Sequence, residues 1–368
     1  MVIAGEASGD QYGGRLLRAM KARHPDLESF GIGGDAMRSE GMRLLAHINE
    51  TSFMGWVEIA RHYGFLRHLF RRCVDEFHAK KPRVVILIDY PGFNLRFARE
   101  AKKAGCRVVY YISPQVWAWG KDRAAKMKPL VDHIAVVFPF EEKIYRALDI
   151  PTTFVGHPLL EILPHIDRNE FLTRFGLPEG RILALLPGSR TQEIQRLLPV
   201  MLQAARAVTH STGCIPVIGA ARVPQNVYEP IMAGFSDFHL LYGATHHLME
   251  HAHAAIVTSG TATVETAYYQ TPMAIVYRTS FLNYQIGKRL IQVPHIGMAN
   301  ILADERIVPE FIQNEVTPSN LTNCVLPLFQ NADFWKLTSE KLKIVRKQMG
   351  APGASDRVAD IVDAFLYD

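Results

Sequence analysis

Short hydrophobic runs alternate with amphipathic stretches along the whole chain. The runs are rich in Val and Ile and lack polar alternation, which is typical of parallel strands covered by helices on both faces. The predicted strands are residues 1–4, 28–32, 83–88, 107–111, 133–137, 152–155, 182–186, 215–218, 238–241, 254–258 and 273–277. Predicted helices fill most gaps, for example residues 11–23, 94–104, 192–210 and 261–269. This alternation predicts an α/β fold with parallel sheets.

The strands form two series, which predicts two Rossmann-like, doubly wound domains in tandem. Pro158 and Pro164 interrupt the pattern between the series. We expect one domain over residues 1–158 and a second over residues 159–345. Residues 346–368 contain a last helical pattern, set apart by Gly350 and Gly353, and we expect it to pack back on the fold. A length of 368 residues suits two domains.

Composition narrows the class of protein. The formal net charge of +5 and the pI near 8.9 suit an anionic partner such as a nucleotide or acidic lipid, and they are too weak to indicate nucleic-acid binding. The four cysteines are widely spaced, without a CxxC pair, which favours a reducing cytoplasm. We expect no signal peptide, and no hydrophobic run reaches the roughly 18 residues that span a bilayer.

Ligands of doubly wound sheets bind beyond the carboxyl ends of the strands. The first strand ends in AGEASGD at residues 4–10, where Glu6 suits sugar hydroxyls or acid–base chemistry, and Ser8 or Asp10 could simply cap the next helix. The third ends in DYPGFN, which contains Asp89 and Asn94. Desolvation there would raise the pKa of Asp89 and make it a better general base, although a turn role is the alternative.

Two turns in the second half suit a diphosphate. Gly188, Ser189 and Arg190 follow a strand and precede a helix, so main-chain N–H groups and a guanidinium could bind phosphate oxygens. A second turn of this kind consists of Ser259, Gly260 and Thr261. Glu265, one helical turn later, could accept hydrogen bonds from ribose hydroxyls or act in a capping box.

Other signals carry less weight. The residues HLMEH at 247–251 match an inverted zinc-protease pattern, which a chain with 15 histidines produces by chance. The Gly-rich residues 31–36 follow the second strand, whereas a dinucleotide site follows the first. No Asp-x-Asp pair occurs. We therefore expect no metal and no cofactor.

Two features could contact lipid. Residues 56–77 have helical spacing, with Leu66 and Phe70 on one side and Arg67 and Arg71 on others, while Phe65 and Leu69 lie off the main stripe. Such a helix could lie on an acidic membrane surface or simply face the core. The tryptophans of the loop at residues 115–119 could line a sugar or acyl groove, or anchor a core.

Seven motifs occur together and in order: AGEASGD (4–10), DYPGFN (89–94), YISPQVWAW (111–119), FPFE (138–141), GHP (156–158), LLPGSR (185–190) and SGTATVE (259–265). With them the chain resembles the bacterial lipid-A-disaccharide synthases over nearly its whole length. The resemblance implies a GT-B glycosyltransferase fold, two Rossmann-like domains facing a cleft. It also implies inverting transfer of 2,3-diacylglucosamine from UDP to the 6-hydroxyl of 2,3-diacylglucosamine 1-phosphate, at the cytoplasmic face of a Gram-negative inner membrane.

The resemblance also assigns residues. It places the family's important acid at Asp89, the phosphate-binding arginine at Arg190 and the ribose-side glutamate at Glu265. We expect Asp89 to be the catalytic base, with Glu6 as the second candidate. Asn300 matches a family asparagine, although Ala299 stands where the family has proline. Family members have a few more residues before the first strand, so we expect a late start here. The alternatives are a UDP-N-acetylglucosamine 2-epimerase, a non-catalytic nucleotide-sugar binding protein and, resting on residues 31–36 alone, a dehydrogenase.

Overall fold

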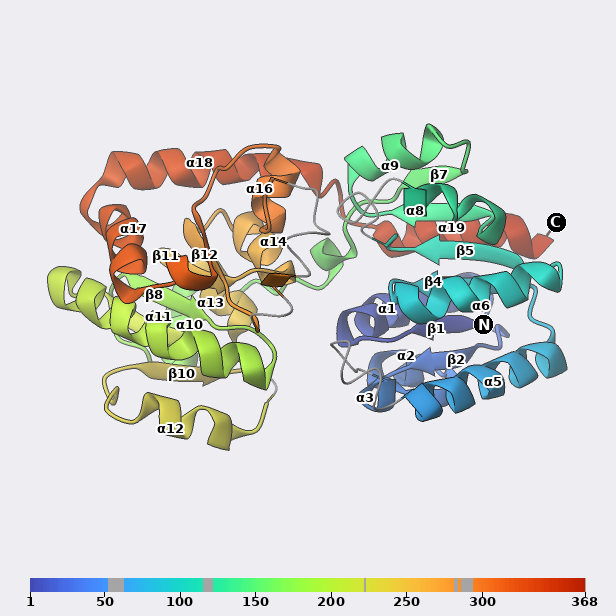
Figure 1. The fold of residues 1–368 in the computed structure, drawn as a ribbon, viewed down its shortest axis with the longest axis horizontal. Helices are drawn as coiled ribbons and strands as arrows, with labels where there is room; N and C mark the ends of the chain where they lie inside the picture. Colours follow the sequence, from blue (N-terminus) through green and yellow to red (C-terminus); the bar gives the residue numbers. More distant parts are fainter. Residues whose placement is uncertain (52–62, 115–121, 222, 281–283, 286–293, 368) are drawn as a thin grey trace. The chain divides into compact units, whose positions relative to one another are not determined.

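The computed structural model describes the chain except for residues 52–62, 115–121, 222, 281–283, 286–293 and 368 (Figure 1). The chain divides into two compact units. Unit 1 comprises Met1–Ile162 and Met349–Asp368, and unit 2 comprises Leu163–Gln348. Each unit has one parallel sheet with helices on both faces, so the predicted α/β class is confirmed. Among the described residues, no helix is both long and apolar enough to cross a membrane.

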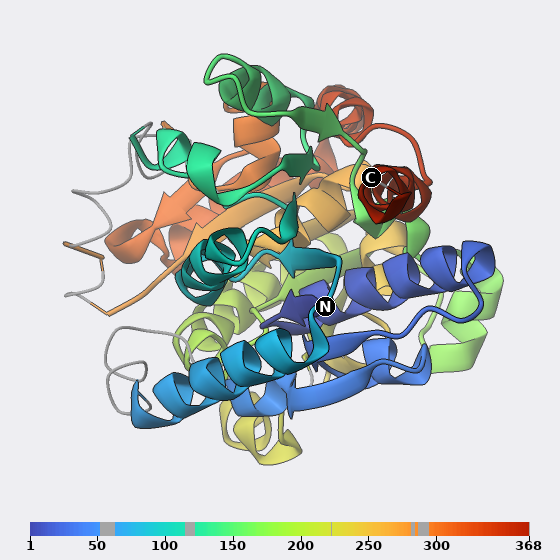
Figure 2. The same cartoon turned by 90° about the vertical axis from the view of Figure 1, so that its right-hand side faces the viewer.

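The sheet of unit 1 has seven strands in the order β3-β2-β1-β4-β5-β6-β7. The strands are β1 (Val2–Ala4), β2 (Phe30–Gly33), β3 (Arg43–His47), β4 (Val84–Ile88), β5 (Arg107–Tyr111), β6 (His133–Val136) and β7 (Thr152–Phe154). The helices are α1 (Ala7–Arg23), α2 (Asp35–Ser39), α3 (Ile48–Thr51), α5 (Tyr63–Lys80), α6 (Pro91–Lys103), α8 (Asp122–Ala125), α9 (Pro139–Arg146) and α19 (Ala354–Tyr367). Figure 2 shows α1 and α19 on one face and α5 and α6 on the other.

The C-terminal helix α19 belongs to unit 1, where it packs against α1, β4 and β5. Arg23, in the last turn of α1, donates to the carboxylates of Asp360 and Asp363 over 2.6 and 2.9 Å. Arg357 donates to the main-chain oxygen of Val155 over 2.8 Å. These contacts tie the end of the chain to the N-terminal sheet.

The sheet of unit 2 has six strands in the order β10-β9-β8-β11-β12-β13. The strands are β8 (Ile182–Leu186), β9 (Ile215–Ala220), β10 (His239–Tyr242), β11 (Ala254–Thr258), β12 (Met273–Tyr277) and β13 (Glu310–Ile312). The helices are α10 (Arg168–Phe175), α11 (Thr191–Thr212), α12 (Glu229–Met232), α13 (Thr245–His251), α14 (Thr261–Tyr268), α16 (Met298–Ala303), α17 (Pro318–Gln330) and α18 (Ala332–Gln348). Helices α11 and α17 pack on the sheet, as do α13 and α14.

Two strands were not predicted from the sequence, and both lie at sheet edges. Strand β3 is polar at both ends, and β13 has only three residues and begins with a glutamate. An edge strand has a neighbour on one side only, so a short, partly polar segment is sufficient there. The hydrophobic pattern of these two strands is correspondingly weak.

Residues 56–62 of the predicted amphipathic helix lie outside the described residues, and α5 covers the remainder.

Candidate functional site

Each sheet reverses its strand order at one place, and the predicted site residues other than Asn300 lie at or just after these two places. In unit 1 the reversal falls between β1 and β4, which pair in parallel with Ala4 opposite Ile88. In unit 2 it falls between β8 and β11, with Leu186 opposite Val257. The loops that follow neighbouring strands diverge at such a switch point and leave a crevice for ligands.

In unit 1 the first loop begins with Gly5 and Glu6, and the second with Asp89 and Tyr90. Asp89 and Tyr90 both have left-handed backbones, with φ of 46° and 49°. The Tyr90 ring lies so close to Gly5 that an added Cβ would be 2.3 Å from its Cγ. Two consecutive non-glycine residues in this region store strain, which is characteristic of functional loops. Glycine at position 5 makes the close approach of the two loops possible.

The Asp89 carboxyl group has a pKa that suits a general base. Its pKa is raised from 3.8 to about 6, mainly by burial and to a smaller extent by the negative charge of Glu6. The Tyr90 main-chain N–H donates to the carboxylate and opposes part of this shift. A carboxylate with a pKa near 6 is largely ionised at neutral pH and still holds a proton well, as general-base catalysis requires.

Asn94 is fully buried behind Asp89. Its side-chain amide donates to the main-chain oxygens of Asp89, over 2.7 Å, and Ile88, over 3.2 Å. Tyr110 was not among the predicted site residues, yet its hydroxyl donates to the same Asp89 oxygen over 2.7 Å. Both residues therefore hold the strained backbone of Asp89. The sequence signal for Tyr110 was only its place near the end of a predicted strand.

Ser8 is exposed in the first turn of α1, whereas Asp10 is 3% exposed. The carboxylate of Asp10 accepts hydrogen bonds from the main-chain N–H groups of Gly34, Ala36 and Met37, over 2.6, 3.0 and 3.1 Å. Asp10 therefore caps α2 rather than its own helix. It fixes the turn after β2 beside the candidate site.

In unit 2 the loop after β8 contains Gly188, Ser189 and Arg190. Gly188 has φ of 112°, and an added Cβ would lie 2.4 Å from a carboxylate oxygen of Glu193. That carboxylate accepts from the Ser189 main-chain N–H over 3.1 Å and from the Arg190 guanidinium over 2.7 Å. The turn thus already binds one anionic group with the donors that we predicted for phosphate.

The loop after β11 contains Ser259, Gly260 and Thr261. Gly260 has φ of 147°, and both Gly260 and Thr261 are exposed at the start of α14. Glu265 lies one turn into α14, and one of its carboxylate oxygens is 3.6 Å from Nε2 of His246. Main-chain donors and an acidic side chain therefore lie together in this loop, as diphosphate and ribose binding would require.

Asn300, the remaining predicted residue, is fully buried. Its amide donates to the main-chain oxygen of Val308 and to the Glu310 carboxylate, each over 2.8 Å, and accepts from the Val308 N–H over 3.0 Å. Trp117 and Trp119 lie outside the described residues. Within the described part of the chain, no group of three or more His, Cys, Asp or Glu residues could hold a metal ion.

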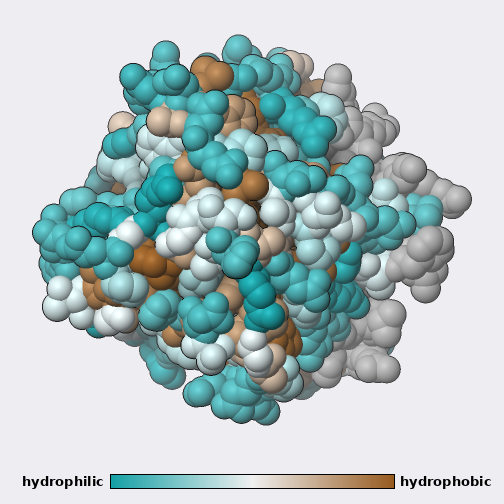
Figure 3. Space-filling view, turned by 90° about the vertical axis from the view of Figure 1, so that its left-hand side faces the viewer, coloured by the Kyte–Doolittle hydropathy of each residue, from teal (hydrophilic) through white to brown (hydrophobic). Residues whose placement is uncertain are grey.

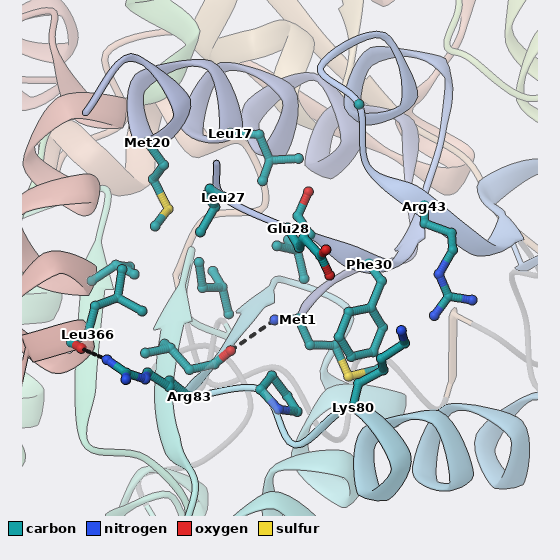
Figure 4. Close-up of a pocket in the computed structure, with 17 residues that line it drawn as sticks. Met1, Leu17, Met20, Leu27, Glu28, Phe30, Arg43, Lys80, Arg83 and Leu366 are labelled. Atoms are coloured by element: carbon teal, nitrogen blue, oxygen red, sulfur yellow. Dashed lines mark hydrogen bonds between the residues drawn. The ribbon is translucent and has the colours of Figure 1, made fainter. Parts of the chain in front are cut away.

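One pocket in unit 1 lies away from these residues, at the amino ends of β1, β2 and β4 (Figure 4). It is lined by side chains that include Met1, Phe30 and Arg83. The amino group of Met1 donates to the Val84 main-chain oxygen over 2.9 Å, and burial lowers its pKa to about 5. Ligands of this fold bind at the carboxyl ends of the strands. The candidate site therefore lies at the opposite ends of the strands from this pocket.

Comparison with solved structures shows the fold of the chain. The chain resembles the calicheamicin glycosyltransferase CalG4 with a TM-score of 0.59 and 14% identity, covering 100% of this chain and 96% of that one. It resembles the UDP-GlcNAc 2-epimerase of Methanocaldococcus jannaschii with a TM-score of 0.64 and 10% identity, covering 99% of each chain. It resembles an S. aureus MnaA–UDP structure with a TM-score of 0.68 and 10% identity, covering 100% of this chain and 96% of that one. At these identities the likeness shows the GT-B fold alone.

Sequence comparisons identify the family. A family model described as Lipid-A-disaccharide synthetase matches residues 1–362. The lipid-A-disaccharide synthase of Trichlorobacter lovleyi is 40% identical, covering 98% of this chain and 96% of the relative. That of Coxiella burnetii (strain Dugway 5J108-111) is 37% identical, covering 100% and 98%. The chain therefore belongs to the lipid-A-disaccharide synthase family and is a glycosyltransferase of lipid A biosynthesis. The epimerase and binding-protein alternatives are not favoured.

Proposed function

We propose that this chain transfers 2,3-diacylglucosamine from UDP to the 6-hydroxyl of 2,3-diacylglucosamine 1-phosphate. The products would be the β-1,6-linked disaccharide 1-phosphate and UDP. The observation that carries the catalytic part is the partly buried Asp89 carboxylate at the switch point of unit 1, with its pKa raised to about 6. Family membership supports the choice of a UDP-sugar donor and a lipid acceptor.

The proposed step is one displacement. Asp89 accepts the proton of the acceptor 6-hydroxyl as that oxygen forms a bond to the anomeric carbon of the donor. The bond from this carbon to the UDP oxygen breaks, and UDP leaves with the electron pair. General-base assistance of this kind contributes about 10²–10⁴ in rate. Because attack comes from the face opposite UDP, an α-linked donor gives a β product.

Unit 2 would bind the leaving group. The loops Gly188–Arg190 and Ser259–Thr261 present main-chain N–H groups at the starts of α11 and α14. The Arg190 guanidinium could replace its bond to Glu193 with bonds to phosphate oxygens. Fixed donors and a cation stabilise charge that develops on the diphosphate in the transition state. Glu265 would accept hydrogen bonds from the ribose.

We further propose that unit 1 contacts an anionic membrane through α5, at the cytoplasmic face of the inner membrane. Phe65 is 37% exposed, and Arg67, Arg71 and Arg72 are exposed on the same helix. Leu69, which the sequence suggested for such a patch, is 3% exposed and packs in the core, so that assignment was wrong. The face of unit 2 in Figure 3 is mostly hydrophilic with separate hydrophobic patches, and we place no contact there.

The test of the reaction is UDP release from UDP-2,3-diacylglucosamine, with and without 2,3-diacylglucosamine 1-phosphate. We expect release only with the acceptor, and a loss of about 10²-fold or more in kcat for Asp89→Asn. Asp26→Asn, at an exposed position of the same unit, is the matched control. Acceptor-independent release, or none from folded wild-type protein, would contradict the transferase proposal.

The test of the membrane contact is flotation with vesicles. Wild-type protein should bind vesicles containing anionic phospholipid more than neutral ones, because basic side chains near the surface add to the apolar contact. The double substitution Arg67→Glu and Arg71→Glu should remove most of this difference. Lys336→Glu with Lys347→Glu, on α18 of unit 2, makes the same change in charge and should have little effect. Equal losses in both variants would contradict the placement on α5.

A further inference from the structure

Glu310 is a buried carboxylate at the start of β13, only 7% exposed. Its oxygens accept three hydrogen bonds: from the main-chain N–H groups of Ile296 and Gly297, both over 3.0 Å, and from the Asn300 amide over 2.8 Å. Within the described residues this carboxylate forms no ion pair. A buried charge is costly unless it is well hydrogen-bonded, so these three donors make Glu310 a fixed anchor.

The anchor holds the turn that leads into α16. Gly297 is the N-cap of that helix, and its main chain lies against β12, since an added Cβ would be 2.3 Å from Cδ1 of Ile275. Asn300, one turn later, links Glu310 to the main chain of Val308 on the segment before β13. Both sides of the turn are therefore fixed, one by packing and one by the Glu310–Asn300 network.

The same turn holds the loop after β11. The Ser259 hydroxyl donates to the main-chain oxygen of Ile296 over 2.8 Å, and the Gly297 N–H of the same peptide unit donates to Glu310 over 3.0 Å. Ser259 immediately precedes Gly260, whose φ of 147° only glycine adopts readily. A chain of hydrogen bonds thus runs from the buried carboxylate through one peptide unit to the exposed turn at Gly260 and Thr261.

We propose that Glu310 is a positioning residue for nucleotide binding. Together with Asn300 it fixes Ile296, which holds Ser259 and thereby sets the Gly260–Thr261 turn in the geometry that receives the diphosphate. This inference rests on the proposed function, because it assigns the UDP diphosphate to that turn. It gives Asn300 a role that needs no contact with substrate, since its amide group is already engaged inside the fold.

The test uses binding of UDP itself, measured by titration calorimetry on the full chain. Glu310→Gln places an amide N–H against main-chain donors, so we expect UDP to bind about tenfold more weakly, a loss that corresponds to one or two buried hydrogen bonds. The KM for the acceptor should not change, because Asp89, the proposed base that faces the acceptor hydroxyl, lies in unit 1. Glu305→Gln, at an exposed carboxylate five residues earlier, is the control and should bind UDP like wild type.

A double-mutant cycle separates positioning from general destabilisation. If Glu310 acts through Ser259, then Glu310→Gln with Ser259→Ala should bind UDP no more weakly than the weaker single variant. Additive losses, or a folded Glu310→Gln protein that binds UDP like wild type, would overturn the inference. Should Glu310→Gln not fold, Asn300→Ser removes one donor of the same network, and wild-type UDP affinity in that protein would overturn it equally. Wild-type protein that binds no UDP would instead contradict the proposed function.

Discussion

The hydroxyl of Tyr110 donates a hydrogen bond of 2.7 Å to the main-chain oxygen of Asp89. Tyr110 lies on β5 and is fully buried, and Asp89 follows the neighbouring strand β4. The Asn94 amide donates to the same oxygen. Asp89 and Tyr90 both have positive φ, so the loop backbone is strained. The two hydrogen bonds to the Asp89 oxygen hold the backbone in this conformation. The orientation of the proposed base thus depends on a side chain that does not itself reach the substrate.

We therefore expect Tyr110→Phe to lower kcat by about two- to tenfold, equivalent to the loss of one hydrogen bond, with the KM of both substrates unchanged. Tyr111→Phe is a matched control: Tyr111 is the adjacent buried tyrosine, and within the described residues its hydroxyl has no hydrogen-bond partner. It should leave kcat unaltered. Steady-state kinetics on the two variants decide the matter, and equal losses of kcat in both would argue against a positioning role.

Activity should depend on pH through Asp89. In wild-type protein we expect kcat/KM to fall as the pH drops through about 6, because Asp89 must be ionised to accept a proton. Glu6→Gln removes the smaller of the two causes that raise this pKa, so the acidic limb should move to lower pH while burial keeps it above 3.8. A Glu6→Gln protein that is inactive at every pH would make Glu6 the base instead.

The same pKa shift has a consequence for stability. A carboxyl group whose pKa is higher in the folded than in the unfolded protein stabilises the fold less as the pH rises from about 4 to about 6. Asp89→Asn carries no charge and should therefore raise the free energy of unfolding relative to wild type, with a gain that grows over this range and is then constant. Urea unfolding at several pH values measures it. A gain independent of pH would show that the charge of Asp89 is not the cause.

The sequence predicted the loops better than it predicted what holds them. Gly188, Ser259 and Asp89 were found because each follows a hydrophobic strand, and strand ends are local features. The hydrogen bonds that hold these loops join more distant positions. Tyr110 and Asp89 are 21 residues apart in the sequence, and Glu310 and Gly297 are 13 apart. Such partners depend on which strands become neighbours, and hydrophobic periodicity does not specify that order. Asp10 shows the same limit, since its capped helix α2 lies in another segment.

Asp10 should matter for stability more than for chemistry. Asp10→Ala leaves three main-chain N–H groups at the start of α2 without their acceptor, and unsatisfied buried donors cost roughly 1–3 kcal/mol each before water or relaxation compensates. We expect a loss of about 2–4 kcal/mol in the free energy of unfolding, measured by urea denaturation. Asp35→Ala is the control, because it removes a carboxylate from the same turn of α2 whose side chain is 74% exposed. It should lower the free energy of unfolding by less than about 1 kcal/mol. Similar losses in both variants would contradict the capping role.

Arg190 should govern the affinity for UDP. In this structure its guanidinium and the Ser189 N–H both bind the Glu193 carboxylate, so the donors already point toward one anion. A diphosphate offers more oxygens and more charge, and we expect it to take over these donors. Arg190→Ala should then weaken UDP binding by about 10- to 100-fold, the range of charge-assisted hydrogen bonds. Arg190→Lys should recover only part of the loss, because an ammonium group cannot bind two oxygens side by side.

Arg196→Ala, at a later position on α11, is the control for the loss of one positive charge. Calorimetric titration with UDP measures all three variants. If Arg196→Ala weakened binding as much as Arg190→Ala, the effect would come from the overall charge of the helix, and the specific role of Arg190 would have to be abandoned.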